Sequence, residues 1–213
     1  MYPGTVLTGC GIKSLRVGKE NHMQLILASA SPRRKALLSL FGIPFTVRAA
    51  DIDETMDPEK PPFDEVARVS RSKALAVNRG EEDIVIAADT IVVCQGKVLG
   101  KPHSEAEAAS MLRLLSGRDH QVMTGCTILY GDRVETFTEV TSLHFRPLSE
   151  KEIQKYVQSG EPMDKAGAYG IQGGAALFCE KLEGDYYNVM GLPVCLLYET
   201  LCRTAPEVME DTL

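Results

Sequence analysis

The sequence predicts an α/β fold on a mixed β-sheet that is flanked by helices. In the first half of the chain, apolar strand patterns alternate with amphipathic helix patterns, the order that βα units produce. In the second half, hairpin patterns dominate and favour antiparallel pairing. The run Ile84–Ala88 is apolar without alternation, as expected of a central strand that is covered on both faces.

The chain of 213 residues is long enough for one domain, or for two closely packed lobes. We expect residues 1–22 to be a disordered extension or a misassigned start, residues 23–205 to form a single domain, and residues 206–213 to be a tail. The net charge of −6 argues against nucleic-acid binding, and no apolar run is long enough to span a membrane. The six scattered cysteines form no zinc pattern, so we expect reduced thiols in a cytoplasmic protein.

The domain begins with the stretch Leu25–Gly42, in which a short apolar strand leads into an amphipathic helix. Ser31 suits an N-cap, Pro32 suits the first helical position, and the closing glycine suits the C′ position. Arg33 and Arg34 stand in the first turn, where free N–H groups and the helix dipole favour an anion such as phosphate. The alternative is a plain capped helix with two solvated arginines.

The next elements surround the central strand. Phe45–Ala49 is a short strand pattern, and an acidic and proline-rich stretch separates it from a helix over Phe63–Arg79, whose apolar residues share one face. The central strand Ile84–Ala88 ends on Asp89, and Ile91–Cys94 then resumes as a strand. Open α/β sheets place their ligands at such strand ends, which makes Asp89 a candidate site residue.

The second half of the domain has two long strands and three helices. Glu105–Leu115 is a helix that Ser104 caps, with its apolar residues on one face. Gln121–Tyr130 and Val134–Phe145 are strands around a tight turn, and a capping box begins the helix Ser149–Ser159. The chain ends with a hairpin of Ala176–Lys181 and Tyr186–Val189, followed by a closing helix from Pro193 to about Cys202.

Several charged residues stand beside predicted turns or acids. Lys73, Lys101 and Lys165 are such residues, and Glu54 lies in an acidic stretch. Carboxylates and several cations around one cleft suit a polyphosphate that is held with a divalent metal. The sequence therefore indicates an α/β enzyme that handles phosphate.

Each candidate also has a structural interpretation. Asp89 could form an Asx-turn, Lys73 and Lys101 could be surface lysines, and Glu54 could be solvated. The glycine-rich stretch Gly167–Gly174 could be a hinge, since the chain contains no Walker A loop and no G-x-G-x-x-G motif. The residue pattern alone does not choose among these interpretations.

Five motifs between Leu25 and Leu201 occur in the order of one known family. They are SASPRR at 29–34, AADT at 87–90, GKP at 100–102, MLRLLSG at 111–117 and GEPMDKAGAYGIQG at 160–173. With them the chain resembles the Maf family of nucleoside triphosphate pyrophosphatases, and within it the branch that cleaves dTTP and UTP to the monophosphate and pyrophosphate.

The resemblance implies an inosine-triphosphatase-like mixed sheet with two lobes around a cleft. It also implies a divalent metal cofactor, Mg²⁺ or Mn²⁺, a cytoplasmic location and often a homodimer. The resemblance further implies a housekeeping role in removing modified or excess nucleotides, and a link to cell-division arrest.

The resemblance further implies residue roles by position. Asp89 matches the catalytic acid that accepts a proton from the attacking water. Positions associated with pyrimidine specificity are matched by Arg33, Thr90 and Gln172. The phosphate-binding positions fall on Ser29, Arg34, Lys73, Lys101 and Lys165, and the metal positions on Glu54 and Asp89.

The chemistry of the base agrees with this assignment. A thymine or uracil ring offers two carbonyl acceptors and one N–H donor, and the Gln172 amide can pair with a carbonyl and the N–H at once. A mismatched base would leave buried polar groups unpaired. The rival activities are hydrolysis of 7-methyl-GTP or another modified nucleotide, and nucleotide sensing by a partner in division control. Gln172 with Thr90 favours pyrimidines, and the intact acids favour an enzyme.

Overall fold

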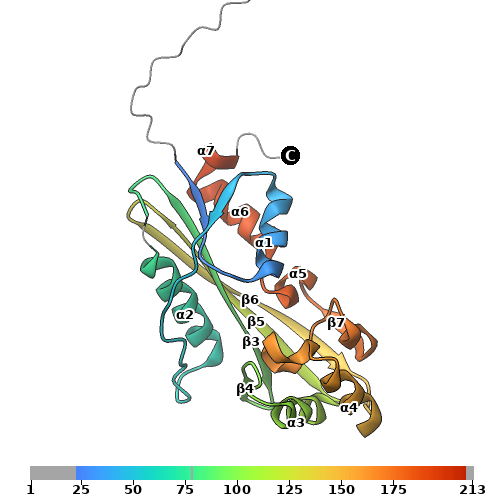
Figure 1. Cartoon of the computed structure of the whole chain (residues 1–213). Coiled ribbons are helices and arrows are strands. Elements are labelled where there is room, and N and C mark those ends of the chain that lie inside the picture. The colour runs from blue at the N-terminus through green and yellow to red at the C-terminus, as the bar shows by residue number, and fades with distance from the viewer. Residues whose placement is uncertain (1–22, 78, 210–213) are drawn as a thin grey trace, which may run out of the picture.

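The computed structural model describes residues 23–77 and 79–209 (Figure 1). The expected extension over residues 1–22 lies outside this part of the chain. The strands are β1 (Leu25–Leu27), β2 (Phe45–Val47), β3 (Ile84–Cys94), β4 (Lys97–Leu99), β5 (Asp119–Tyr130), β6 (Arg133–Phe145) and β7 (Cys179–Glu183).

These strands form one seven-stranded sheet in the order β2-β1-β3-β5-β6-β7, with β4 paired to β3 off this path. Strand β1 pairs in parallel with β2 and β3, whereas every other pairing is antiparallel. The predicted mixed sheet is confirmed. The parallel pairs come from the first half of the chain, and the antiparallel pairs β5–β6 and β6–β7 come from the second, as the two kinds of pattern indicated.

Helices cover both faces of this sheet. They are α1 (Pro32–Leu38), α2 (Pro62–Ala76), α3 (Glu105–Leu115), α4 (Glu150–Gln158), α5 (Tyr186–Met190), α6 (Val194–Thr204) and α7 (Pro206–Met209). Short 3₁₀ turns lie at Ser39–Phe41, Glu161–Asp164, Ala166–Ala168 and Gly174–Leu177. Figure 1 shows α2 on one side of β3 and β5, α1 and α6 on the other side, and α3 and α4 at the far end of the long strands.

The central strand β3 divides its side chains between two cores because residues alternate across a strand. Ile84 and Ile86 are buried with leucines of α1 and α6, whereas Val85 and Ala87 are buried with Ala74 of α2. By the same alternation Asp89 lies on the α2 face and Thr90 on the α1 face. A third core at the far end gathers α3, α4 and the end of β6.

The open edge of β3 has a gap in its pairing. Strand β1 ends opposite Ile86, and β4 begins to pair only at Val92. Within the described residues no strand covers this edge over residues 87–91, while β5 pairs along the whole opposite edge. Side chains from both faces of the sheet can therefore meet at the gap.

Helix α2 approaches the sheet closely at Gly125 of β5. A Cβ at this position would overlap the carbonyl oxygen of Val66 and lie 2.8 Å from the nitrogen of Ala67. Farther along the helix, the Ser70 hydroxyl bonds to the Thr127 hydroxyl at 2.8 Å. Glycine is needed at this position because any side chain would push the helix backbone away from the sheet.

The predicted helix caps are confirmed. The Ser31 hydroxyl accepts from the Arg34 N–H at 3.4 Å, Pro32 begins α1, and Gly42 adopts a left-handed φ of 71° after the last turn. Ser104 caps α3, whose bounds match the expected helix, and α4 begins with the predicted capping box. Helix α2 and strand β2 end earlier than expected, at Ala76 and Val47.

The final hairpin predicted for Ala176–Lys181 and Tyr186–Val189 is wrong. Strand β7 pairs with β6, and the second predicted strand is helix α5. Asp185 caps this helix, and the buried Asn188 donates to the Val122 carbonyl and the Thr141 hydroxyl. These contacts with distant strands stabilise a short helix where tyrosine and valine favour a strand.

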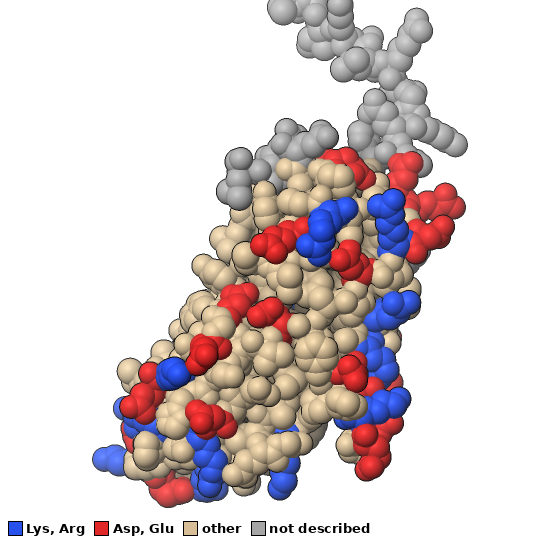
Figure 2. All heavy atoms as spheres, turned by 180° about the vertical axis from the view of Figure 1, so that it is seen from behind, with Lys and Arg blue, Asp and Glu red and all other residues tan. Residues whose placement is uncertain are grey.

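The packed part of the chain extends past residue 205. Residues 206–209 form α7, and Met209 is buried in the same core as the leucines of α6. No helix among the described residues is long and apolar enough to cross a membrane. The five cysteines in this part of the chain are free thiols. On the face seen in Figure 2, acidic and basic side chains are interspersed.

Candidate active site

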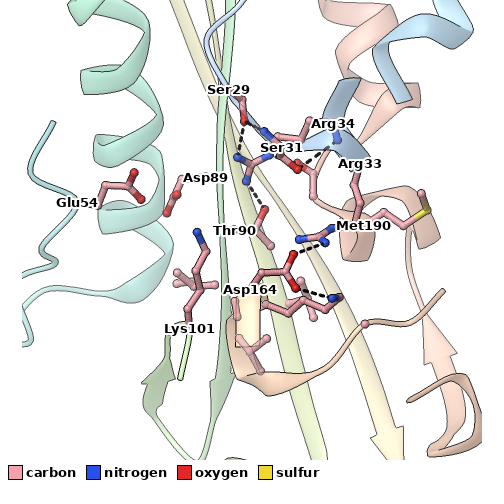
Figure 3. A pocket seen from close by; sticks show the side chains of 18 of the residues that line it. Ser29, Ser31, Arg33, Arg34, Glu54, Asp89, Thr90, Lys101, Asp164 and Met190 are labelled. Carbon is pink, nitrogen blue, oxygen red and sulfur yellow. Dashed lines mark hydrogen bonds and ion pairs between the residues drawn. The ribbon is translucent and has the colours of Figure 1, made fainter. Parts of the chain in front are cut away.

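A pocket of about 1110 Å³ lies at the gap in the edge of β3. It is lined by the β1–α1 turn, the loop before α2, the middle of β3, the segment after β4, and residues 161–173. Figure 3 shows how side chains from these elements converge. All ten site residues predicted from the sequence line this pocket: Ser29, Arg33, Arg34, Glu54, Lys73, Asp89, Thr90, Lys101, Lys165 and Gln172.

Lys73 lies between two carboxylates. Its Nζ is 2.7 Å from Asp89 Oδ1 and 2.8 Å from Glu54 Oε2. Lys73 and Asp89 are buried, whereas the Glu54 side chain is 54% exposed. The buried carboxylate of Asp89 has its charge partner in the Lys73 ammonium, which makes its burial tolerable. Lys73 is thus not a surface lysine, and Asp89 is not an Asx-turn residue at a strand end.

The expected break of the strand at Asp89 is wrong, because β3 continues through it to Cys94. Asp89 pairs with Gly125 and Thr90 with Thr124 in the ladder with β5. The candidate acid therefore lies in the middle of a long strand. It still faces a ligand pocket because the other edge of β3 is open there.

Glu54 is held by its loop, which is fixed to the first turns of α2. Arg68 donates from Nη2 to the Thr55 carbonyl at 2.8 Å, and the Asp57 N–H donates to Glu65 Oε2 at 2.8 Å. The hydrogen bonds from Arg68, followed by that from Asp57, lower the pKa of Glu65 to about 2. The loop with Glu54 is therefore anchored by an ionised pair.

Arg34 uses its guanidinium to join three elements. Its Nη1 donates to Ser29 Oγ at 3.2 Å, Nη2 to Thr90 Oγ1 at 2.9 Å, and Nε to the Gly191 carbonyl at 2.8 Å. All three partners are neutral. Desolvation lowers the pKa of Arg34, and the nearby charge of Asp89 opposes this shift. The guanidinium fixes the β1–α1 turn to β3 and places a positive charge behind Thr90.

Asp164 is the shared counter-ion of two predicted site residues. Its carboxylate accepts from Arg33 Nη1 at 3.1 Å and from Lys165 Nζ at 2.6 Å; Figure 3 marks the contact with Arg33 by a dashed line. Desolvation by itself would raise the pKa of Asp164, but the hydrogen bonds from Lys165 and Arg33 outweigh it and lower this pKa. Arg33 belongs to the first helix and Lys165 to a distant loop, so Asp164 brings the two together.

Lys101 and Gln172 present polar groups without such partners. Within residues 23–77 and 79–209, no carboxylate lies within 4.0 Å of the Lys101 ammonium, which points toward Asp89 in Figure 3. Gln172 is exposed on the pocket wall, and none of the described residues hydrogen-bonds to its amide. Both groups are available to a ligand in the pocket.

The segment that leads to Gln172 is anchored on the far core. Gly167 has a left-handed φ of 68°, and a Cβ there would lie 2.7 Å from a methyl group of Val92. The Gly167 N–H donates to the Gly100 carbonyl at 3.0 Å, and the Tyr169 hydroxyl bonds to His120 Nε2 at 2.9 Å. The glycine-rich stretch is thus a packed wall of the pocket.

The two acids can supply part of a metal site. No group of three or more His, Cys, Asp or Glu residues that could hold a metal is found within the described ranges. Glu54 and Asp89 each use one carboxylate oxygen to bind the Lys73 ammonium. Their other oxygens, Glu54 Oε1 and Asp89 Oδ2, have no partner among the described residues. Mg²⁺ commonly binds one or two carboxylates together with substrate phosphates and water, so this donor set fits such an ion.

Sequence reasoning missed Asp164, Glu161 and the carbonyl of Gly191. Asp164 and Glu161 stand in the long motif at 160–173, and the acid beside Lys165 was the available signal. The carbonyl of Gly191 could not be found, since a backbone acceptor leaves no mark in the residue pattern.

The chain matches the family model described as Maf-like protein over residues 24–204. A Halalkalibacterium halodurans protein named dTTP/UTP pyrophosphatase is 54% identical, over 80% of this chain and 90% of that protein. Proteins of the same name from Geobacillus and Bacillus cereus are 51% and 48% identical, over 87% and 85% of this chain and 96% and 90% of theirs. A solved dITP/XTP pyrophosphatase from Mycobacterium abscessus superposes with a TM-score of 0.37 at 11% identity, over 59% of this chain and 76% of that chain.

Proposed function

The chain belongs to the Maf family, and on this premise we propose that it hydrolyses dTTP and UTP to the nucleoside monophosphate and pyrophosphate. Three relatives named dTTP/UTP pyrophosphatase share about half of their residues with it over most of its length. The observation that carries the proposal is the Asp89–Lys73–Glu54 cluster, which faces further cations across one pocket. A carboxylate that can accept a proton, beside phosphate-binding cations, is what hydrolysis of a phosphoanhydride requires.

In the proposed reaction Asp89 accepts a proton from the attacking water. The water oxygen forms a bond to the α-phosphorus, and the bond from that phosphorus to the α–β bridging oxygen breaks. The bridging oxygen takes the electron pair and leaves as part of pyrophosphate. Lys73 supports this role because its ammonium, 2.7 Å from Asp89 Oδ1, holds the carboxylate in a fixed position in the pocket.

Charge on the leaving pyrophosphate is neutralised by the basic residues of the pocket. Lys101 has no acidic partner among the described residues, and Lys165 and Arg33 share only one. The guanidinium of Arg34 is hydrogen-bonded to Thr90 and to the Gly191 carbonyl, so it stabilises the phosphate charge through its own positive charge from behind Thr90. Phosphoryl transfer depends mainly on this kind of positioning and electrostatic stabilisation.

A divalent cation, Mg²⁺ or Mn²⁺, belongs to the proposal. Glu54 and Asp89 would hold it through carboxylate oxygens, with the remaining ligands from the triphosphate and water. When bound, such an ion neutralises charge on phosphate oxygens and helps to orient them. The half-exposed Glu54 suits this role because its carboxylate reaches the solvent side of the pocket.

Base selection is assigned to Gln172, with Thr90 and Arg33 as further specificity residues. The Gln172 amide can pair with a carbonyl and the N–H of a uracil or thymine ring. Its exposure on the pocket wall leaves both its donor and its acceptor for this pairing. A cytosine presents a different donor and acceptor pattern and would leave part of the amide unpaired.

A panel of substrates tests the proposal. Release of pyrophosphate would be measured with dTTP, UTP, CTP and 7-methyl-GTP, with Mg²⁺, with Mn²⁺ and with a chelator. We expect metal-dependent turnover of dTTP and UTP above the other two. Preference for 7-methyl-GTP would replace the pyrimidine assignment. A binding partner retained by a variant without turnover would favour the sensing role.

From the family we also propose a cytoplasmic homodimer that limits the incorporation of modified nucleotides and is linked to cell-division arrest. Sedimentation of the purified chain tests the dimer, because a monomer mass at micromolar concentration would contradict it. Growth and septum formation in cells with and without the active chain test the link to division.

A further inference from the structure

The turn Gly170–Gly174, which carries Gln172, is held at both ends by one relay of hydrogen bonds. The N–H of its first residue donates to the Tyr156 hydroxyl at 3.0 Å, and that hydroxyl donates to Glu161 Oε1 at 2.9 Å. The other oxygen, Glu161 Oε2, accepts from the N–H of the last residue at 3.0 Å. One tyrosine and one glutamate thus fix the distance between the two ends of the turn.

The backbone of the turn lies directly on these two side chains. A Cβ at Gly173 would overlap the Glu161 carboxylate, and one at Gly174 would lie 3.2 Å from the Tyr156 ring. The turn also closes on itself, because the Gly173 N–H donates to the Gly170 carbonyl at 3.0 Å. Glycine stands at position 173 because a side chain there would displace the Glu161 carboxylate that supports the turn.

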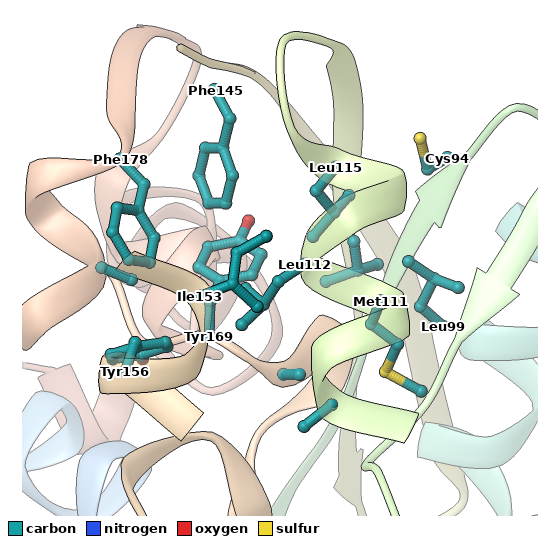
Figure 4. Packing of buried hydrophobic residues seen from close by; sticks show 14 of the residues in the cluster. Cys94, Leu99, Met111, Leu112, Leu115, Phe145, Ile153, Tyr156, Tyr169 and Phe178 are labelled. Atoms are coloured by element: carbon teal, nitrogen blue, oxygen red, sulfur yellow. The ribbon is translucent and has the colours of Figure 1, made fainter. Parts of the chain in front are cut away.

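Tyr156 is a rigid support. It is buried on α4, and its ring meets Phe178 edge-on, with centroids 5.2 Å apart and an angle of 85°. Figure 4 shows Tyr156, Phe178 and Tyr169 in the same apolar cluster. Burial raises the pKa of Tyr156, so its hydroxyl stays protonated and can donate to Glu161.

None of the described residues hydrogen-bonds to the Gln172 amide, so its position depends on the backbone turn that the relay holds. We propose that Tyr156 and Glu161 are positioning residues for base selection, which fix the turn so that the Gln172 amide meets the pyrimidine edge. This inference rests on the proposed function, in which Gln172 pairs with the base. A recognition group that is about 1 Å out of place loses much of its discrimination.

Glu161 supports base recognition with its side chain and phosphate binding with its backbone. Its side chain holds the turn, whereas its backbone carbonyl accepts from Lys165 Nζ at 2.6 Å. A substitution of the side chain leaves this carbonyl in place. The variant Glu161→Gln therefore separates the positioning of the base from the binding of phosphate.

The experiment compares Tyr156→Phe and Glu161→Gln with wild type, using dTTP and dCTP. Tyr156→Phe keeps the ring packing and removes only the relay oxygen. We expect the ratio of the two kcat/KM values to fall about tenfold in each variant, mainly because KM for dTTP rises; tenfold corresponds to about 1.4 kcal/mol. Inhibition by pyrophosphate should be unchanged. Amide hydrogen exchange at Gly170 and Gly174 should become faster.

The matched control is Glu152→Gln, which removes a carboxylate from the same helix. Glu152 accepts from Arg146 at 2.6 Å and closes the capping box of α4, and it makes no hydrogen bond to the turn Gly170–Gly174. Glu152→Gln should lower the unfolding temperature and leave the ratio of the kcat/KM values for dTTP and dCTP as in wild type. If this control changes the ratio as much as Tyr156→Phe does, the effect is one of general stability and the inference is wrong.

A double-mutant cycle with Gln172→Ala completes the test. If the relay acts through Gln172, Tyr156→Phe should not reduce the ratio further once Gln172 is gone. If wild type shows no preference for dTTP and UTP, the proposed function fails and this inference fails with it. If Gln172→Ala loses the preference but Tyr156→Phe and Glu161→Gln keep it, only the positioning role is wrong.

Discussion

Asp89 and Gly125 face each other across strands β3 and β5, and this pair sets the position of Lys73. Helix α2 rests on Gly125 through the backbone of Val66, and its Lys73 then reaches Asp89 at 2.7 Å. The glycine has no chemical role of its own. It permits the close approach that brings the candidate acid and its cation together.

Asp89→Asn should lower pyrophosphate release from dTTP by at least about 10²–10⁴-fold, because the amide cannot accept the proton of the attacking water. The fold should persist, since the amide has the same shape and Glu54 remains as a partner of Lys73. Pyrophosphate assays and thermal unfolding would be run beside Asp132→Asn, an exposed acid outside the pocket. Undiminished turnover by Asp89→Asn would remove the proposed mechanism.

Lys73→Met should destabilise the fold by about 3 kcal/mol, because it leaves the buried Asp89 without its cation. Chemical denaturation at neutral pH measures the change. Lys60→Met is the control, since Lys60 and its partner Asp57 are both well exposed and 3.7 Å apart. Equal losses of unfolding free energy in Lys73→Met and Lys60→Met would contradict a buried ion pair between Lys73 and Asp89.

Gly125→Ala should cost about 1–3 kcal/mol and reduce kcat, because the added methyl group displaces α2 and with it Lys73. Gly80→Ala is a suitable comparison, since its Cβ would make only a 3.4 Å contact with Asp83. Unfolding and turnover are measured on both. A loss of stability without a loss of activity would show that Lys73 does not depend on the position of α2.

Stability should fall as the pH drops from about 6.5 toward 4. Burial lowers the pKa of His120 from the ordinary value of 6.5 to about 4. Between these values the unfolded chain binds a proton that the folded chain does not, so folding loses up to about 3 kcal/mol. Denaturation at several pH values should show this slope in wild type and a flatter one in His120→Gln. The exposed His103 provides the control variant His103→Gln, whose slope should match wild type.

Asp164→Asn should strengthen inhibition by pyrophosphate, most clearly at low salt, because Arg33 and Lys165 lose their shared counter-ion. The fold should be little affected, since the Asp164 side chain is 63% exposed. Glu150→Gln removes another exposed carboxylate, the partner of Arg113, and should leave inhibition unchanged. Weaker inhibition in Asp164→Asn would mean that Asp164 orients the two cations rather than competing with phosphate.

The caps and apolar patterns allowed much of the fold to be predicted. Ser31, Pro32 and Gly42 mark the first helix correctly because capping is a contact between near neighbours in the chain. The prediction of a strand over Tyr186–Val189 is wrong for the opposite reason, because contacts with distant residues decide its structure. Asn188 is held by β5 and β6, and such distant contacts override the strand preference of tyrosine and valine.

The sequence by itself determined the mixed α/β class, the family resemblance and ten of the residues that line the pocket, since motifs and periodicity are local properties of the chain. The tertiary structure decided how those residues are paired. It placed Asp89 in mid-strand at an unpaired edge, set Lys73 between two acids, and joined Arg33 to Lys165 through Asp164. These relationships depend on strand register and helix approach, which arise only when distant segments pack together.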